Sequence, residues 1–377
     1  MKRIITKHIQ NDLPSKIVLL TGPRQCGKTT LAKALYTSFD YFNYDAAEDR
    51  LSLKEKSWDR TKKLIIFDEV HKMKQWKRWI KGVYDTEGIP PELLVTGSAK
   101  LDTYRKVGDS LAGRYFQYRL HPLDLHEIAQ FSTENHESIF QTLWDCGGFP
   151  EPFIKNNKNY YQRWRRTHTD IILRQDLIDL HAVKDIQSIE TLVLLLQSRV
   201  GSTTSYSNLA RDLERDVNTV KRWLQLLENM YIIFRVTPHS NKISRAILKE
   251  PKFYFYDFGF IEDEDAKLEN MVASALLKKL QYIEDTQGIK TGLHYLRTKD
   301  SVEIDFLISQ KNKPTHLIEI KSSDDKPATG FKHFSQFIKN AKQIQLVRNL
   351  SREKTYPDGL AIQSVIPWLA KMDIGAE

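Results

Sequence analysis

KIVLLTGPRQCGKTT, residues 16–30, is the stretch of sequence that decides the fold of the first third of this chain. Its apolar run Lys16–Thr21 has no polar face, which is typical of a strand buried in a parallel sheet, and Thr29–Tyr36 has helical periodicity. Between them, Gly22–Thr29 matches G-x-x-x-x-G-K-[ST] in the strand-to-helix context that this phosphate-binding motif requires. The stretch predicts a βαβ unit with a nucleotide site at its first turn.

The loop residues have separate roles in this predicted site. The glycines let the backbone fold round a phosphate, so that N–H groups and the helix N-terminus point at the anion. We expect Lys28 to reach the β and γ phosphates of ATP and the Thr29 hydroxyl to bind Mg²⁺. The expected nucleotide-binding residues are Gly22, Pro23, Arg24, Gln25, Cys26, Gly27, Lys28, Thr29 and Thr30.

Two further buried-strand patterns, Leu64–Phe67 and Leu93–Thr96, each end in polar residues. Asp68 and Glu69 directly follow the first, so we expect Asp68 to bind Mg²⁺ through water and Glu69 to orient or deprotonate the attacking water. Ser98 follows the second strand and is expected to touch the same water or the γ phosphate. An acidic strand end exposed to solvent is the structural alternative for the two carboxylates.

Five motifs carry a resemblance to a known family: LLTGPRQCGKTT, LIIFDEVHK, LLVTGSAK, LAGRYFQYRLHPLDLHEI and GGFPEP. In this order they resemble an uncharacterised prokaryotic family of AAA+-type ATPases, over nearly the whole chain. The resemblance implies ATP binding, with Ser98 as a sensor and Arg114 as an arginine finger or sensor. The catalytic residues expected are Lys28, Glu69, Ser98 and Arg114. A basic helix offers Arg163, Arg165, Arg166 and Arg174 as second-sensor arginines, for most of which a solvated basic face is the alternative.

The expected fold class is α/β, in four parts. Residues 1–130 read as a doubly wound, AAA+-like P-loop ATPase domain and 131–182 as a helical linker or lid broken by Gly147–Pro152. A helix–helix–helix–strand order predicts a winged helix over 183–250. Residues 251–377 read as a C-terminal α/β domain of restriction-endonuclease-like fold.

One helix of the expected winged helix has a polar face, formed by Asn218, Lys221, Arg222 and Gln225. Such side chains read purine edges or contact phosphates, which favours DNA as a partner. Glu214, Asp216 and Glu228 stand close by and would repel a duplex. A role in packing alone is therefore the alternative.

The C-terminal strands VEIDFLI (Val302–Ile308) and LIEIK (Leu317–Lys321) place their charged residues opposite their apolar ones. The pattern D…E-x-K after a helix with Glu269 is similar to the PD-(D/E)xK nuclease family. This resemblance implies a second metal site with Asp305 and Glu319 as ligands, Glu269 as an accessory acid and Lys321 as helper of the nucleophile. A live nuclease and a degenerate binding domain both stay open.

The composition of the 377-residue chain narrows its partners and location. Lys and Arg outnumber Asp and Glu by 57 to 48, a net charge of +9 that suits an anionic partner. Cys26 and Cys146 form no CxxC pair, which excludes a disulfide framework or thiolate zinc site. We find no bilayer-spanning stretch and no export signal, so we expect a cytoplasmic protein without a membrane partner.

The leading hypothesis is an enzyme that binds ATP and Mg²⁺, hydrolyses ATP and acts on or near nucleic acid. The main alternative is an ATP-controlled switch or adaptor whose C-terminal domain binds protein or DNA without catalysis. A small-molecule kinase is disfavoured, because Glu69 provides for water. Arg114 acting in a neighbouring subunit would require a homo-oligomer, which the sequence leaves open.

Overall fold

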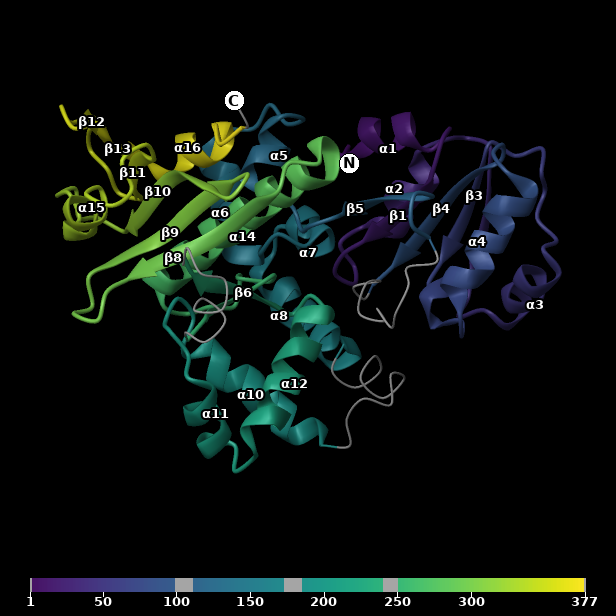
Figure 1. The fold of residues 1–377 in the computed structure, drawn as a ribbon, viewed down its shortest axis with the longest axis horizontal. Coiled ribbons are helices and arrows are strands. Elements are labelled where there is room, and N and C mark those ends of the chain that lie inside the picture. Colours follow the sequence, from purple (N-terminus) through teal and green to yellow (C-terminus); the bar gives the residue numbers. More distant parts are fainter. Residues whose placement is uncertain (1, 99–110, 173–184, 240–249, 376–377) are drawn as a thin grey trace. The chain divides into compact units, whose positions relative to one another are not determined.

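The structure is a computed structural model that describes residues 2–98, 111–172, 185–239 and 250–375. It divides into two compact units, Met1–Pro122 with Asn229–Tyr231, and Leu123–Glu228 with Ile232–Glu377 (Figure 1). The sequence predicts four parts instead. The last three of these, 131–182, 183–250 and 251–377, lie within the second unit, except for Asn229–Tyr231.

The first unit is built on a parallel sheet of five strands in the order β2-β3-β4-β1-β5. The central strands are buried along their whole length, which explains their continuous apolar sequences. The predicted parallel α/β sheet is therefore confirmed. Its elements are α1 (Thr6–Asp12), β1 (Ile17–Thr21), α2 (Lys28–Ala34), β2 (Phe39–Asn43), α3 (Ala47–Glu55), β3 (Leu64–Asp68), α4 (Trp76–Glu87), β4 (Glu92–Gly97) and β5 (Tyr115–Arg119).

Strand β4 lies between β1, which leads into the P-loop, and β3, which ends at Asp68. The register pairs Thr96 of β4 with Leu20 on one side and with Asp68 on the other. Because the carboxyl ends of parallel strands meet at one edge of a sheet, the residues after β4 lie between the P-loop and the Asp68–Glu69 pair. The strand order thus assembles the candidate site.

Aromatic packing fixes β3 in the first unit. The ring centroid of Phe67 lies 5.3 Å from that of Trp58 and 5.2 Å from that of Trp79, both in edge contact. Phe67 precedes Asp68 directly, so this cluster anchors the end of the strand from which the acidic side chains project.

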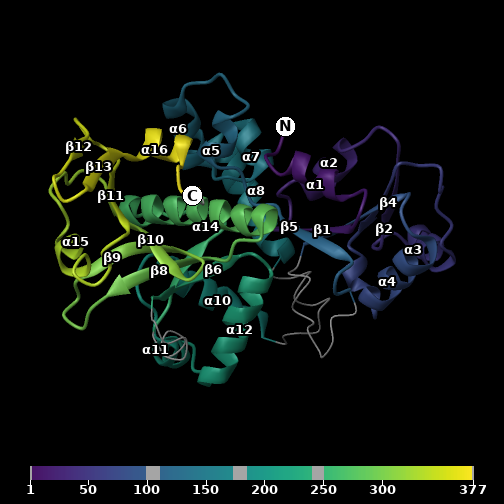
Figure 2. The same cartoon turned by 45° about the horizontal axis from the view of Figure 1, so that its top comes forward.

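The second unit contains an eight-stranded mixed sheet in the order β12-β13-β11-β10-β9-β8-β6-β7. Its long helix α14 packs against β7, β8 and β10, and Figure 2 shows it lying along the sheet. The elements before the sheet are α5 (Leu125–Ala129), α6 (His136–Cys146), α7 (Pro150–Lys155), α8 (Lys158–Asp170), α10 (Ile186–Gln197), α11 (Tyr206–Asp212) and α12 (Val217–Asn229). Those of the sheet and its helices are β6 (Ile233–Pro238), β7 (Lys252–Phe255), α14 (Glu264–Gln287), β8 (Thr291–Arg297), β9 (Glu303–Gln310), β10 (Lys313–Lys321), α15 (Thr329–Phe334), β11 (Lys342–Val347), β12 (Lys354–Thr355), β13 (Leu360–Ser364) and α16 (Val365–Lys371).

The helices α10, α11 and α12 occur where the sequence predicts them, and the hairpin β6–β7 follows. This hairpin is not a separate wing, because Thr237 of β6 pairs with His294 of β8 in a parallel ladder. The sequence-predicted boundary at residue 250 therefore falls between two strands of one sheet. Local patterns cannot reveal this pairing, since β6 and β8 are separated by more than fifty residues.

Caps define the ends of α14, which carries Glu269. The Asp263 carboxylate accepts a hydrogen bond from the Ala266 amide at the start, and Gly288 ends the helix with a φ of 65°. None of the described helices is both long enough and apolar enough to cross a membrane.

Candidate functional site

The P-loop between β1 and α2 depends on glycine at both of its ends. A Cβ added at Gly22 would lie 2.1 Å from the Leu120 carbonyl oxygen, so a side chain there would collide with backbone. Gly27 precedes α2 with a φ of 96°, a left-handed conformation that glycine adopts without strain. The motif glycines therefore shape the loop, as the sequence predicts.

Lys28 is buried and turned back over its own loop. Its ammonium group donates hydrogen bonds to the carbonyl oxygens of Gly22, at 2.9 Å, and Pro23, at 2.7 Å. These neutral acceptors are weaker partners for an ammonium than phosphate oxygens are. The side chain is thus positioned at the loop in a form that an anion can recruit.

A buried arginine that the sequence analysis missed supports the same loop. Arg3 donates to the carbonyl oxygen of Cys26 at 3.0 Å and to that of His121. The contact joins residues far apart in sequence, so no local motif could have identified it.

Asp68 accepts hydrogen bonds from hydroxyl groups on three sides. Its Oδ2 accepts hydrogen bonds from Thr29 Oγ1 and Tyr41 OH, each at 2.8 Å, and its Oδ1 accepts one from the Thr96 hydroxyl. The pairing of Thr29 with Asp68 brings together the two residues that the sequence assigns to Mg²⁺. Tyr41 was missed, since its contact follows from the pairing of β2 with β3. Burial and the bond to Asp68 raise the pKa of Tyr41 well above its usual value.

Glu69 follows β3 in a left-handed conformation with a φ of 56°. Its Oε2 accepts a hydrogen bond from Ser98 Oγ at 3.1 Å, and His71 Nε2 and Lys72 Nζ lie 3.6 and 3.9 Å from the same oxygen. Burial lowers the pKa of His71, which favours its neutral form. The predicted residues Glu69 and Ser98 are therefore in contact, and His71 is a neighbour that sequence reasoning missed.

Arg114 lies away from this site within its own unit. It directly precedes β5 at the amino end of the sheet, where its backbone oxygen accepts from the Ile17 amide, whereas the P-loop follows the carboxyl end of β1. Its guanidinium pairs with the Asp85 carboxylate, Nε lying 2.7 Å from Oδ1. The chain thus does not bring Arg114 to its own P-loop, and a role in a neighbouring subunit stays a prediction.

The second-sensor arginines also stay predictions. Arg163, Arg165 and Arg166 lie on α8 in the second unit, and Arg174 lies outside the described residues. The Arg165 guanidinium stacks 3.8 Å from the centroid of the Phe260 ring, which gives it a packing role.

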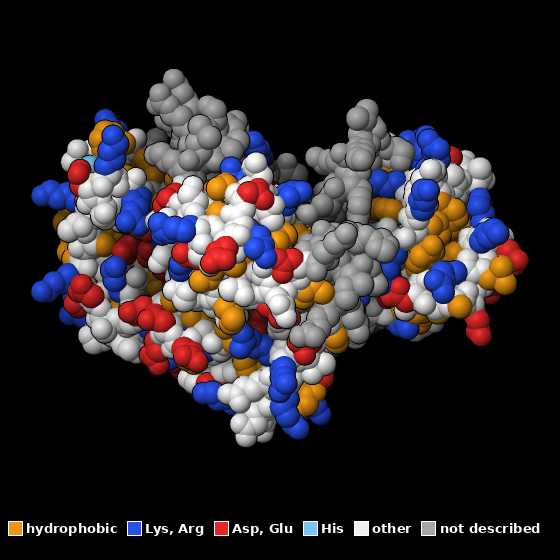
Figure 3. Space-filling model, turned by 90° about the horizontal axis from the view of Figure 1, so that it is seen from below, with side chains coloured by type: hydrophobic (Ala, Val, Ile, Leu, Met, Phe, Trp, Pro, Cys, Tyr) orange, Lys and Arg blue, Asp and Glu red, His pale blue; other side chains and the backbone are white. Residues whose placement is uncertain are grey.

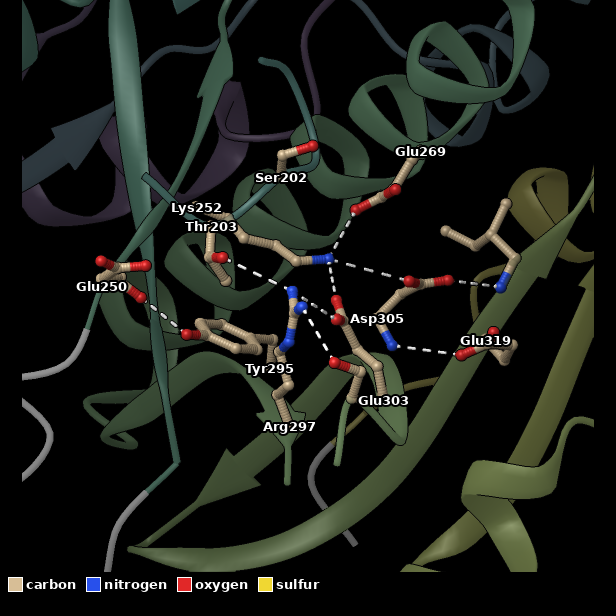
Figure 4. A network of polar contacts seen from close by, with 12 residues as sticks. Ser202, Thr203, Glu250, Lys252, Glu269, Tyr295, Arg297, Glu303, Asp305 and Glu319 are labelled. Carbon is tan, nitrogen blue, oxygen red and sulfur yellow. Dashed lines mark hydrogen bonds and ion pairs between the residues drawn. The ribbon is translucent and has the colours of Figure 1, made fainter. Parts of the chain in front are cut away.

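The four C-terminal residues singled out from sequence converge in the second unit, and Figure 4 shows three of them, Glu269, Asp305 and Glu319. Asp305 Oδ2 accepts from the Ile320 amide at 2.9 Å, and Glu319 Oε2 accepts from the Asp305 amide at 3.3 Å. Lys321 Nζ lies 2.7 Å from Glu319 Oε1, and Glu269 reaches the group from α14. We call Glu269, Glu303, Asp305 and Glu319 the carboxylate cluster.

Sequence reasoning missed two members of this arrangement. Glu303 lies two residues before Asp305, on the same side of β9, so strand alternation could have found it. Lys252 is buried at the start of β7, and its ammonium lies 3.2 Å from Glu269 Oε1 and 2.5 Å from Glu303 Oε1. Nothing in its local sequence signals this role.

Burial controls the ionisation of the cluster. Loss of solvent, reinforced by the Glu269 charge, raises the pKa of Asp305 to about 7, and burial with the Asp305 charge raises that of Glu319 to about 7. Burial alone would lower the pKa of Lys252, but the surrounding carboxylates outweigh it and raise that pKa above its usual value. Among the described residues, no group of three or more His, Cys, Asp or Glu side chains is arranged to hold a metal ion.

Three family models match successive segments of the chain. Residues 14–129 match the family model of an AAA domain, 137–263 that of a domain of unknown function (DUF8612), and 264–369 that of another (DUF4143). The C-terminal matches therefore name no winged helix and no nuclease.

Individual similar proteins are distant. An uncharacterised protein of Mycobacterium tuberculosis is 26% identical over 316 residues, covering 81% of this chain and 70% of that protein. An uncharacterised protein of Methanocaldococcus jannaschii is 24% identical over 378 residues, covering 90% and 83%. A solved structure of the replication initiator DnaA bound to AMPPCP and single-stranded DNA is 18% identical, with a TM-score of 0.32 over 59% of this chain and 86% of that one. None of these likenesses assigns an activity.

Proposed function

We propose that the protein binds ATP with Mg²⁺ and hydrolyses it. The observation that carries this proposal is the Glu69 carboxylate, which Ser98 holds at the same sheet edge as the P-loop and the Thr29–Asp68 pair. A carboxylate beside the phosphate site, one residue beyond the one assigned to Mg²⁺, is placed to act on water.

Each side chain has a distinct task in this proposal. Lys28 exchanges its carbonyl partners for phosphate oxygens, which bind an ammonium more strongly. Thr29 and Asp68 would hold Mg²⁺, which neutralises charge on the phosphates.

Glu69 takes a proton from water as the water oxygen bonds to the γ phosphorus and ADP leaves. Ser98 positions Glu69 for this step. The proposal is tested by phosphate release from ATP in wild type and in Glu69→Gln, each measured with Mg²⁺ and with EDTA.

We further propose that hydrolysis is coupled to nucleic acid. Lys221 and Arg222 of α12 are exposed and can meet phosphates. On the described part of the face in Figure 3, basic side chains are interspersed with acidic ones. This face therefore offers no continuous basic band for nucleic acid. We propose instead a local contact between the nucleic-acid phosphates and Lys221 and Arg222.

DNA is expected to raise the rate of phosphate release by wild type. Lys221→Ala/Arg222→Ala should lose this stimulation, with a shallower salt dependence of DNA binding, while its rate without DNA stays unchanged. Lys54→Ala, which removes an exposed charge from α3, is the control. An unchanged response in the double variant would assign α12 a packing role, and no response in wild type would favour the ATP-controlled switch or adaptor.

A second candidate function is metal-dependent cleavage of nucleic acid at the carboxylate cluster. The specific observation in its favour is that Glu319, chosen with Asp305 and Lys321 by the D…E-x-K pattern, contacts both of them, with Glu269 nearby. Paired carboxylates hold a divalent ion that can prepare water and stabilise the charge of a phosphodiester transition state.

If this domain is a nuclease, wild type cuts DNA or RNA only with Mg²⁺ or Mn²⁺, and Asp305→Asn and Lys321→Ala reduce cutting to the protein-free level. Asp300→Asn is the matched control, because Asp300 is exposed in the β8–β9 connection. The assay is run with and without ATP. Cutting that survives both substitutions, or no cutting at all, would leave the domain as a binding module.

A further inference from the structure

The Lys252 side chain lies at the centre of the carboxylate cluster. Only 1% of Lys252 is exposed, and its Nζ lies 2.5 Å from Glu303 Oε1, 3.2 Å from Glu269 Oε1 and 3.8 Å from Asp305 Oδ1. These oxygens come from β9 and α14, whereas Lys252 comes from β7 (Figure 4). A single ammonium therefore occupies the space that the three carboxylates surround.

Other donors also contact the carboxylates of the cluster. Glu303 Oε2 lies 3.2 Å from Arg297 Nη1, and Tyr254 OH donates to Glu269 Oε1 at 2.6 Å. Lys321 pairs with Glu319, and the Ile320 amide donates to Asp305. The negative charge is thus compensated from within the protein, as buried carboxylates require.

The backbone holds Lys252 in this position on both sides. Lys252 pairs with Val236 in the β6–β7 ladder and forms a bridge with Thr203, while the Thr204 amide donates to the Pro251 oxygen at 2.8 Å. A Cβ added at Gly201 would lie 2.7 Å from Glu269 Oε2, so the chain before Thr203 packs directly on the cluster. The Lys252 side chain is therefore enclosed, and its ammonium could leave the cluster only if the surrounding backbone moved.

A divalent ion would need the same oxygens. Mg²⁺ and Mn²⁺ bind carboxylate oxygens at about 2.0–2.2 Å, and a second cation beside a buried ammonium would be strongly repelled. We propose that the Lys252 ammonium is the resident cation of the carboxylate cluster and closes it to divalent ions. The inference stands against the second candidate function, because a cluster closed by Lys252 holds no Mg²⁺ or Mn²⁺ and would not support metal-dependent cleavage.

Mn²⁺ binding to nucleotide-free, full-length protein tests this inference, with free Mn²⁺ measured by electron paramagnetic resonance. Wild type and Asp305→Asn should bind the same number of ions, because the cluster contributes none. Lys252→Met should gain one site whose affinity exceeds any wild-type binding at the cluster by ~10²-fold or more, since the repelling charge is gone. Lys252→Met/Asp305→Asn should lose the gained site.

Lys252→Arg is the matched control, because it keeps a cation in place and should bind Mn²⁺ as wild type does. A wild-type site that Asp305→Asn removes would overturn the inference, and so would a folded Lys252→Met protein that gains no site. If Lys252→Met does not fold, the comparison of wild type with Asp305→Asn decides alone. No nucleic acid is present, so an absence of nuclease activity leaves this result unaffected.

Discussion

Replacing Glu69 by glutamine should stop ATP turnover while nucleotide binding is retained. Glutamine has the shape of glutamate and can still accept the hydrogen bond from Ser98, but its amide cannot take a proton from water. Loss of a general base costs ~10²–10⁴-fold in rate. Because Asp68, Thr29 and Lys28 are unchanged, the contacts to Mg²⁺ and the phosphates should persist.

Single-turnover phosphate release and equilibrium binding of a fluorescent ATP analogue measure the two properties separately. Glu55→Gln makes the same chemical change at an exposed position on α3 and should alter neither. Undiminished turnover in Glu69→Gln would refute the catalytic role of Glu69. Loss of binding together with turnover would instead assign the carboxylate to holding Mg²⁺.

Lys28→Ala should lose nucleotide binding itself. Among the contacts described, the Lys28 ammonium donates only to two backbone oxygens of its own loop. Removing the side chain therefore costs the fold of the P-loop only these two hydrogen bonds. Hydrogen bonds to charged groups are worth about 1.5–3 kcal/mol each, and the loss of those to the phosphates should weaken ATP binding by ~10²-fold.

Isothermal titration with ATP and Mg²⁺ measures this loss, and thermal unfolding checks that the variant is folded. Lys54→Ala removes an exposed lysine from the same unit and should bind ATP as wild type does. Wild-type affinity in Lys28→Ala would contradict the assignment of the P-loop as the nucleotide site.

The sequence by itself determined the parallel sheet of the first unit and the residues at its carboxyl edge. Short apolar runs such as Leu64–Phe67 are typical of strands buried on both faces, and the P-loop motif is contiguous, so both can be recognised from the local sequence. Strand alternation likewise put Asp305 and Glu319 on the polar side of their strands.

The tertiary structure alone decided which distant side chains join these residues. Tyr41 reaches Asp68 because β2 pairs with β3, and Arg114 lies at the opposite sheet edge because of the register of β5. No local pattern encodes strand order or register, which depend on packing of the whole sheet.

The same limit explains why the sequence placed a domain boundary inside the second sheet. Pairing of β6 with β8 brings β7 into that sheet, and with it Lys252 into the carboxylate cluster. In the sequence alone, a lysine at the start of an apolar strand is typical of a strand end that is exposed to solvent. Its burial against Glu269, Glu303 and Asp305 exists only once three separate segments have packed, because a buried charge is stable only beside its counter-charges.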